Sequence, residues 1–117
     1  MRLKSEIWVN GYLRRCHSAG AIAVVARHGD DDAGAIFIKI SRLDGTAQLF
    51  GPAAAGLANP DGERRWTACF GMAAVGESDV DERIRREASF DPDLWVVEVE
   101  DRGGRHFLED WLAGTER

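Results

Sequence analysis

The feature that most constrains the fold is a segment in the last third of the chain that contains a helix end, a strand and a turn in succession. Pro92 disfavours helix at the residue before it, and residues 94–99 then alternate as in a β-strand. The side chains predicted to point inward are Trp95, Val97 and Val99, and those predicted to point outward are Glu98 and Glu100. Gly103 and Gly104 then turn the chain. The fold therefore includes a sheet with a buried face.

Four further stretches have the composition of strands. Residues 21–26 and 36–40 are rich in apolar and β-branched side chains and flank a polar turn, which predicts a hairpin-like connection between them. The pair Asp44-Gly45 predicts a tight hairpin into a strand at 46–50, and residues 65–70 alternate as a further strand. The side chains expected to share a face are Ile36, Ile38 and Ile40 in one strand, and Trp66, Ala68 and Phe70 in another.

Two longer stretches carry the three- and four-residue spacing of apolar side chains that is typical of helices. The first is predicted to be capped by Ser5 and to end at Gly20. The second is predicted to begin at Ser78, with Asp81 completing a box-like cap. Its buried positions are expected to be Val80, Ile84 and Ala88. A short helix is expected over residues 107–112.

These elements predict an α+β fold of about five mostly antiparallel strands, with two main helices and a short C-terminal helix. Consecutive strands are joined by connections too short for parallel crossovers, and we expect both long helices to pack on one face of the sheet. A chain of 117 residues, of which 44% are hydrophobic, suits one core. We therefore expect a single globular domain over residues 1–117.

Charge and cysteine content bear on the kind of partner and on the compartment. With 20 acidic against 15 basic residues the net charge is −5, which disfavours nucleic acid and anionic membranes as partners. The longest apolar run is far shorter than a bilayer span, and the N-terminus is charged, so we expect a cytoplasmic protein. Cys16 and Cys69 lie outside any metal-ligand spacing, which favours free thiols. We expect no cofactor and no metal.

Several blocks of the chain resemble a family of small alphaproteobacterial proteins known as domain of unknown function 1491. The blocks are residues 3–9 (LKSEIWV), 12–16 (YLRRC), 36–39 (IFIK), 42–47 (RLDGTA) and 90–98 (FDPDLWVVE). The resemblance covers nearly the whole chain, and the blocks are specific as a set. It implies a bacterial cytosolic protein. Because no activity is attached to the family, it gives no catalytic residues.

The sequence brings no acid, base and nucleophile together, so we expect a small non-enzymatic binding or regulatory domain. Its partner is expected to be another protein or a further copy of the chain. The expected docking surface is the polar end beside the terminal aromatic helix, where charged groups surround an apolar anchor. This surface consists of Glu98, Glu100, Arg102, Arg105, His106 and Trp111.

Three alternatives stay open. One is an enzyme in which His106 works as an acid–base pair with Glu98 or Glu100. Another is a structural subunit of a larger assembly. A third is an anionic ligand held by arginines, although the interspersed carboxylates of the second helix favour pairing within that helix. The arginines concerned are Arg64, Arg65, Arg83, Arg85 and Arg86.

Overall fold

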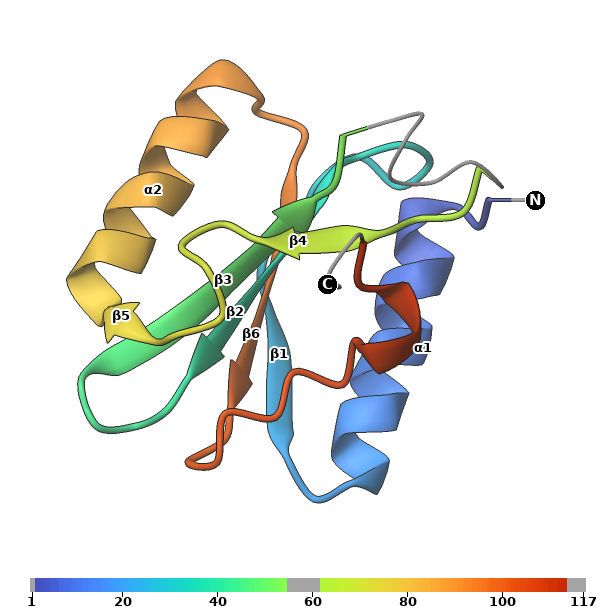
Figure 1. Ribbon diagram of the computed structural model, residues 1–117. Helices are drawn as coiled ribbons and strands as arrows, with labels where there is room; N and C mark the ends of the chain where they lie inside the picture. Colours follow the sequence, from blue (N-terminus) through green and yellow to red (C-terminus); the bar gives the residue numbers. More distant parts are fainter. Residues whose placement is uncertain (1, 55–61, 114–117) are drawn as a thin grey trace.

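A mixed sheet with one long helix on each face forms the molecule (Figure 1). The computed structural model describes residues 2–54 and 62–113. In chain order the elements are α1 (Ser5–Ser18), β1 (Ile22–Arg27), β2 (Ile36–Ser41), β3 (Thr46–Pro52), β4 (Trp66–Ala68), β5 (Val75–Gly76), α2 (Glu77–Phe90), β6 (Trp95–Glu100) and the 3-10 turn η1 (Glu109–Trp111). The predicted α+β class, the two long helices and the short C-terminal helical turn are confirmed. Within the described residues, neither helix has the length and apolar content needed to cross a bilayer.

The strands lie in the order β1-β6-β2-β3-β4, with β5 also paired to β3. Only the β2–β6 pair among the described strands is parallel, so the mainly antiparallel prediction is confirmed. The Asp44-Gly45 hairpin is confirmed too: Gly45 has a φ of 89° and Asp44 Oδ1 accepts a hydrogen bond from Thr46 N at 2.9 Å. The predicted hairpin-like connection between β1 and β2 is wrong, because β6 lies between these two strands.

The larger core lies between α1 and one face of the sheet. Side chains of α1 meet alternate residues of the strands there, and the three inward residues predicted for β6 and for β2 are all buried among them. The α1 side of this core consists of Trp8, Val9, Tyr12 and Cys16, and the sheet side includes Ile36, Ile38, Ile40, Phe50, Trp66, Trp95, Val97 and Val99. Both predicted strand registers are confirmed.

A second core lies between α2 and the opposite face of the sheet. The predicted stripe of Val80, Ile84 and Ala88 is confirmed on this side. The prediction that both helices pack on one face is therefore wrong. Phe37 of β2 and Val96 of β6 point to the second face and are apolar too, so α2 buries this face as α1 buries the first. Phe70 packs here rather than beside Trp66, because β4 ends at Ala68 and the chain turns.

Two predicted helix caps are wrong. Ser5 is the first residue of α1 rather than its cap, and its buried hydroxyl donates a hydrogen bond to Gly34 O at 2.6 Å. Ser78 lies inside the first turn of α2. The N-cap residue of this helix is Gly76, and no side chain forms a capping hydrogen bond there. The hydroxyl of Ser5 thus ties the start of α1 to the segment before β2 instead of satisfying a helix terminus.

Candidate functional site

The turn after β6 carries the two arginines of the predicted docking surface. Arg105 binds the carboxylate of Asp101 with two nitrogens, Nη2 to Oδ1 at 2.7 Å and Nε to Oδ2 at 3.2 Å. The hydrogen bonds from Arg105 hold the pKa of Asp101 below its usual range. Arg105 also donates to Ala19 O at 3.3 Å, which connects this turn to the end of α1. Arg105 is thus engaged within the protein, and Arg102 lies exposed beside it.

His106 faces the α1 side of the molecule. Its Nδ1 accepts a hydrogen bond from Leu108 N at 2.9 Å, and its ring lies 5.1 Å from that of Phe50, centroid to centroid. The main-chain carbonyl of His106 accepts a hydrogen bond from the Tyr12 hydroxyl at 2.6 Å. Among the described residues no carboxylate bonds to this imidazole, and Glu98 lies on the opposite face of the sheet. The structure does not bring the suggested acid–base pair together.

Trp111 lies against α1, between Trp8 and Arg15. Its ring makes an edge contact with Trp8, with centroids 5.3 Å apart, and the Arg15 guanidinium sits 4.4 Å above it. Trp111 is half-buried by these contacts. Of the six predicted surface residues, the structure therefore groups His106 and Trp111 with the α1 face and sets Glu98 apart from them.

Glu98 belongs instead to a charge cluster around Lys39 on the α2 face. Lys39 Nζ lies 2.8 Å from Asp81 Oδ1, 2.8 Å from Glu77 Oε2 and 3.9 Å from Glu98 Oε2, and the lysine side chain is only 6% exposed. Burial alone would lower the pKa of Lys39, but the hydrogen bonds to Asp81 and Glu77 outweigh it and raise that pKa. Burial raises the pKa of Glu98, with Lys39 opposing.

Sequence reasoning missed the role of Lys39. A lone lysine within an otherwise apolar strand, facing a helix whose acids Glu77 and Asp81 are spaced by one turn, was the available signal. Two of the three carboxylates around the ammonium, Glu77 and Asp81, come from α2 and hold this helix against the sheet. This cluster is thus a structural ion-pair network.

Two of the three arginines of α2, Arg83 and Arg85, pair within the helix, as the interspersed acids predicted. Arg83 Nε lies 2.8 Å from Glu87 Oε2, and Arg85 pairs with Glu82. Arg64, from the same predicted set, lies two residues before the start of β4 and is buried. The α2 arginines therefore offer no cluster of uncompensated charge.

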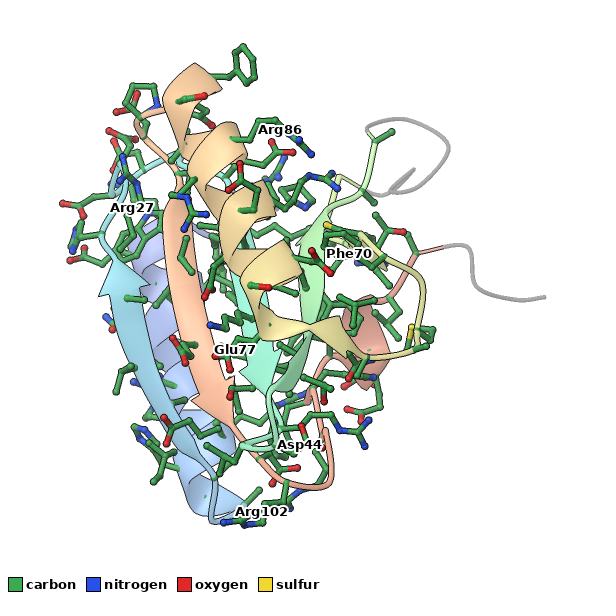
Figure 2. The ribbon with its side chains drawn as sticks, turned by 90° about the vertical axis from the view of Figure 1, so that its left-hand side faces the viewer. Arg27, Asp44, Phe70, Glu77, Arg86 and Arg102 are labelled. Atoms are coloured by element: carbon green, nitrogen blue, oxygen red, sulfur yellow. The ribbon has the colours of Figure 1, made fainter. Side chains whose placement is uncertain are left out.

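The edge strand β1 presents apolar side chains to solvent. Ile22 is 60% exposed, Val24 53% and Val25 38%, whereas Ala23 is buried against α1. In Figure 2, β1 lies beside α2 rather than beneath it, so the helix leaves this strand uncovered. Between β1 and α2 runs a groove of about 260 Å³. Its lining includes Ala26, Arg27, Ile84, Arg85, Val96 and Glu98. Few monomeric domains leave an apolar strand edge this open.

These features define a small α+β domain with two cores and one open apolar edge. The family model described as a protein of unknown function, DUF1491, matches residues 3–109. The chain belongs to this family, and the resemblance stated from the sequence blocks is confirmed. No curated protein matches the chain.

Solved structures of relatives share the fold. A crystal structure of a DUF1491 family protein from Caulobacter crescentus CB15 is 42% identical, with a TM-score of 0.78 over 97% of this chain and 100% of that one. An NMR structure of a DUF1491 family protein from the same source is 45% identical, with a TM-score of 0.78 over 97% of this chain and 99% of that one. The solution structure of protein Atu0922 from A. tumefaciens is 40% identical, with a TM-score of 0.73 over 86% of each chain.

Proposed function

We propose that the protein is a small non-enzymatic binding domain whose docking surface is the open edge of β1. The observation that carries this is the row of exposed apolar side chains, Ile22, Val24 and Val25, on a strand at the edge of the sheet. An edge strand offers main-chain donors and acceptors to an added strand. Outside the ladder with β6, the described residues of β1 make no backbone–backbone hydrogen bond.

One carbonyl of β1 is already engaged by a side chain. His17 Nε2, at the end of α1, lies 2.9 Å from Ala23 O. Because His17 is exposed, an incoming strand can displace this single contact and replace it with a main-chain hydrogen bond. The pairing of β1 with β6 is regular from Ile22 to Val25, and a register shift follows between Val25 and Arg27.

A second copy of this chain fits the edge. Antiparallel pairing of β1 with itself, centred on Val24, sets Ile22 opposite Ala26 of the other copy and keeps both α2 helices on the same side. Arg27 of each copy then lies about 10 Å, two strand spacings, from Glu100 of the other, a span that two long side chains can bridge. Arg27 donates to Pro92 O at 3.0 Å and has no carboxylate partner among the described residues.

The proposal extends to location and to partner class. Cys16 and Cys69 are free thiols in two different cores, as expected of a protein kept in the reducing cytoplasm. The net charge of −5 supports a protein partner over nucleic acid or an anionic membrane.

Sedimentation equilibrium of the full chain, from micromolar to millimolar concentration, tests the proposal. The wild type should shift towards a dimer, and Val24→Lys should weaken the association at least about tenfold, equivalent to about 1.4 kcal/mol. The matched control is Ile7→Lys on α1, since Ile7 is 51% exposed and Val24 53%. A wild type that stays monomeric throughout, or equal association of both variants, overturns self-association through β1.

A further inference from the structure

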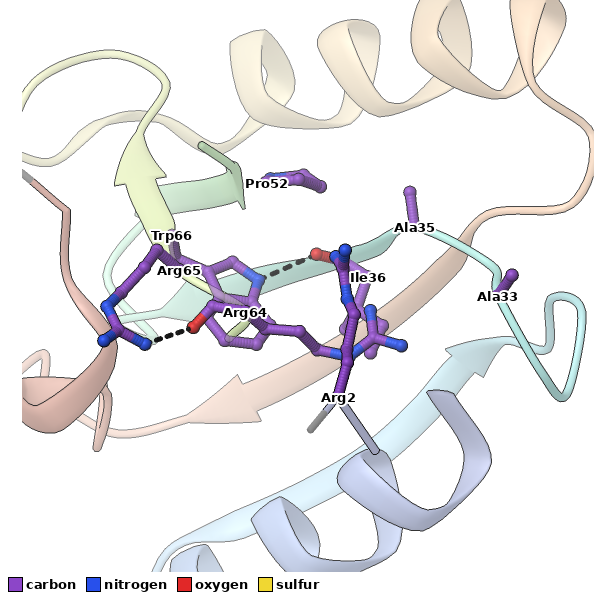
Figure 3. A pocket seen from close by; sticks show the side chains of 8 residues that line it. All are labelled: Arg2, Ala33, Ala35, Ile36, Pro52, Arg64, Arg65 and Trp66. Atoms are coloured by element: carbon purple, nitrogen blue, oxygen red, sulfur yellow. Dashed lines mark hydrogen bonds between the residues drawn. The ribbon is translucent and has the colours of Figure 1, made fainter. Parts of the chain in front are cut away.

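A cavity lies where the segment before α1 meets the segment leading into β4 (Figure 3). It has a volume of about 120 Å³, and its lining includes Arg2, Arg64 and Arg65 beside the apolar Pro52 and Trp66. One water molecule needs only about 10–15 Å³, so the cavity has room for a larger group. It shares no residue with β1, and a ligand here is therefore independent of docking at that edge.

Arg64 is the most constrained cation of this cavity, with 7% of its surface exposed. Its Nη2 donates to Leu3 O at 3.0 Å and to Ser5 Oγ at 2.9 Å. Its buried Nε has no hydrogen-bond partner, and no carboxylate among the described residues pairs with this guanidinium. Buried arginines are ordinarily paired with an anion, because an uncompensated buried charge is strongly unfavourable. The buried guanidinium of Arg64 therefore has no anionic partner among the described residues.

Arg2 adds a second guanidinium to the same cavity. It also lines an adjoining cavity of about 190 Å³, together with Lys4 and Asp32. Among the described residues that line these two cavities, Asp32 is the one carboxylate, and it lies 3.7 Å from Lys4 Nζ. Burial, and then the charge of Arg2, lower the pKa of Arg64. Positive charge thus exceeds negative charge between the two arginines.

We propose that this cavity binds a phosphate group, held between the guanidinium groups of Arg64 and Arg2. Guanidinium groups present paired donors that match the oxygens of phosphate, and two of them can neutralise a dianion. A carboxylate carries only one charge and would leave one arginine uncompensated. The apolar wall formed by Ala35, Pro52 and Trp66 suits the organic part of a phosphate ester.

An NMR titration of the full chain, following the Arg64 Nε–H signal, tests the ligand class. Inorganic phosphate and phenyl phosphate should each produce a saturable shift of this signal. Tighter binding of phenyl phosphate identifies an ester as the source of the group, and tighter binding of inorganic phosphate identifies the free ion. Sodium acetate and sodium chloride at the same ionic strength should produce no saturable shift. An equal shift with either of them overturns the proposal.

Arg2→Gln tests the site without disturbing the buried bonds of Arg64, because Arg2 is exposed. The variant should weaken binding of the better phosphate ligand by about tenfold, as expected for one lost charge-assisted contact. Arg102→Gln is the matched control, since it removes the same charge from an exposed turn outside the cavity, and it should change the affinity by less than about twofold. Equal affinities of the two variants show that only net charge matters and overturn the site.

Discussion

Lys39 Nζ and Asp81 Oδ1 lie 2.8 Å apart, and this contact joins the middle of the sheet to the helix on its outer side. Glu77, one helical turn earlier, meets the same ammonium at 2.8 Å. Because two carboxylates of α2 converge on one enclosed cation, the contacts fix both the position of the helix and its rotation about its own axis. The apolar stripe of α2 alone would allow it to slide along the sheet.

Lys39→Met should destabilise the protein by about 1–3 kcal/mol, less than the 3–5 kcal/mol expected for a fully buried pair, because the remaining carboxylates keep partial access to water. Urea unfolding at neutral pH measures the loss. The control is Arg85→Met, which breaks the exposed pair with Glu82 and should change the free energy of unfolding by less than about 0.5 kcal/mol. Equal losses in the two variants would contradict a special role for Lys39.

Glu98→Gln should have a pH-dependent effect. Burial raises the pKa of Glu98 in the folded state, so folding favours its protonated form. The ionised form of Glu98 therefore destabilises the folded protein. This destabilisation is absent below the usual glutamate pKa of about 4.3 and complete above the raised pKa of the folded state. The variant should therefore gain up to about 1 kcal/mol at neutral pH, where partial exposure screens the charge, and gain nothing below about pH 4. A loss of stability at neutral pH would mean that attraction to Lys39 dominates.

Trp95→Ala should destabilise the protein by about 3–5 kcal/mol, since a large buried side chain is lost. Trp95 is 2% exposed, and its Nε1 donates to Asp30 O at 2.7 Å. Denaturant unfolding measures the loss. The comparison variant is Trp111→Ala: because the Trp111 side chain is only half-buried, its removal should lower the free energy of unfolding by less than about 3 kcal/mol. A loss below about 1 kcal/mol for Trp95→Ala would contradict its place in the core.

The two cysteines should differ in their reaction with a thiol reagent such as DTNB. Burial raises the pKa of both thiols, so little thiolate is present at neutral pH and both should react slowly in the folded protein. Cys69 is half-buried and should react before Cys16, which is fully buried. Cys69→Ser assigns the faster phase, and unfolding in urea should release both thiols at once. Immediate reaction of Cys16 would contradict its burial.

Much of the strand pattern could be predicted, because side chains alternate between the two faces of a strand whichever strands lie next to it. The alternation of Trp95 and Val97 with Glu98 predicts that the two apolar side chains share one buried face of β6, whatever lies beside it. The side of the sheet that each helix covers could not be predicted in this way. A stripe containing Val80 and Ile84 shows that a helix has a buried face, but not which face of a sheet it meets.

The candidate sites depend on contacts between distant parts of the chain. Ile22 and Val24 have the composition of a buried strand, and only the strand order shows that they lie at an open edge. Arg64 was recognisable as a possible anion ligand from its charge. Its burial was not, because the acceptor on Ser5 that holds it comes from a segment 59 residues earlier.

The last described strand in the sequence, β6, lies inside the sheet rather than at its edge. β6 pairs with β1 on one side and with β2 on the other, so before Trp95 has been synthesised β1 has no partner. Until β6 has been synthesised, a nascent chain on the ribosome therefore carries an unpaired apolar strand, a state prone to aggregation. Closure of the sheet is a late, non-local step. We expect the complete sheet to form only as β6 leaves the exit tunnel of the ribosome.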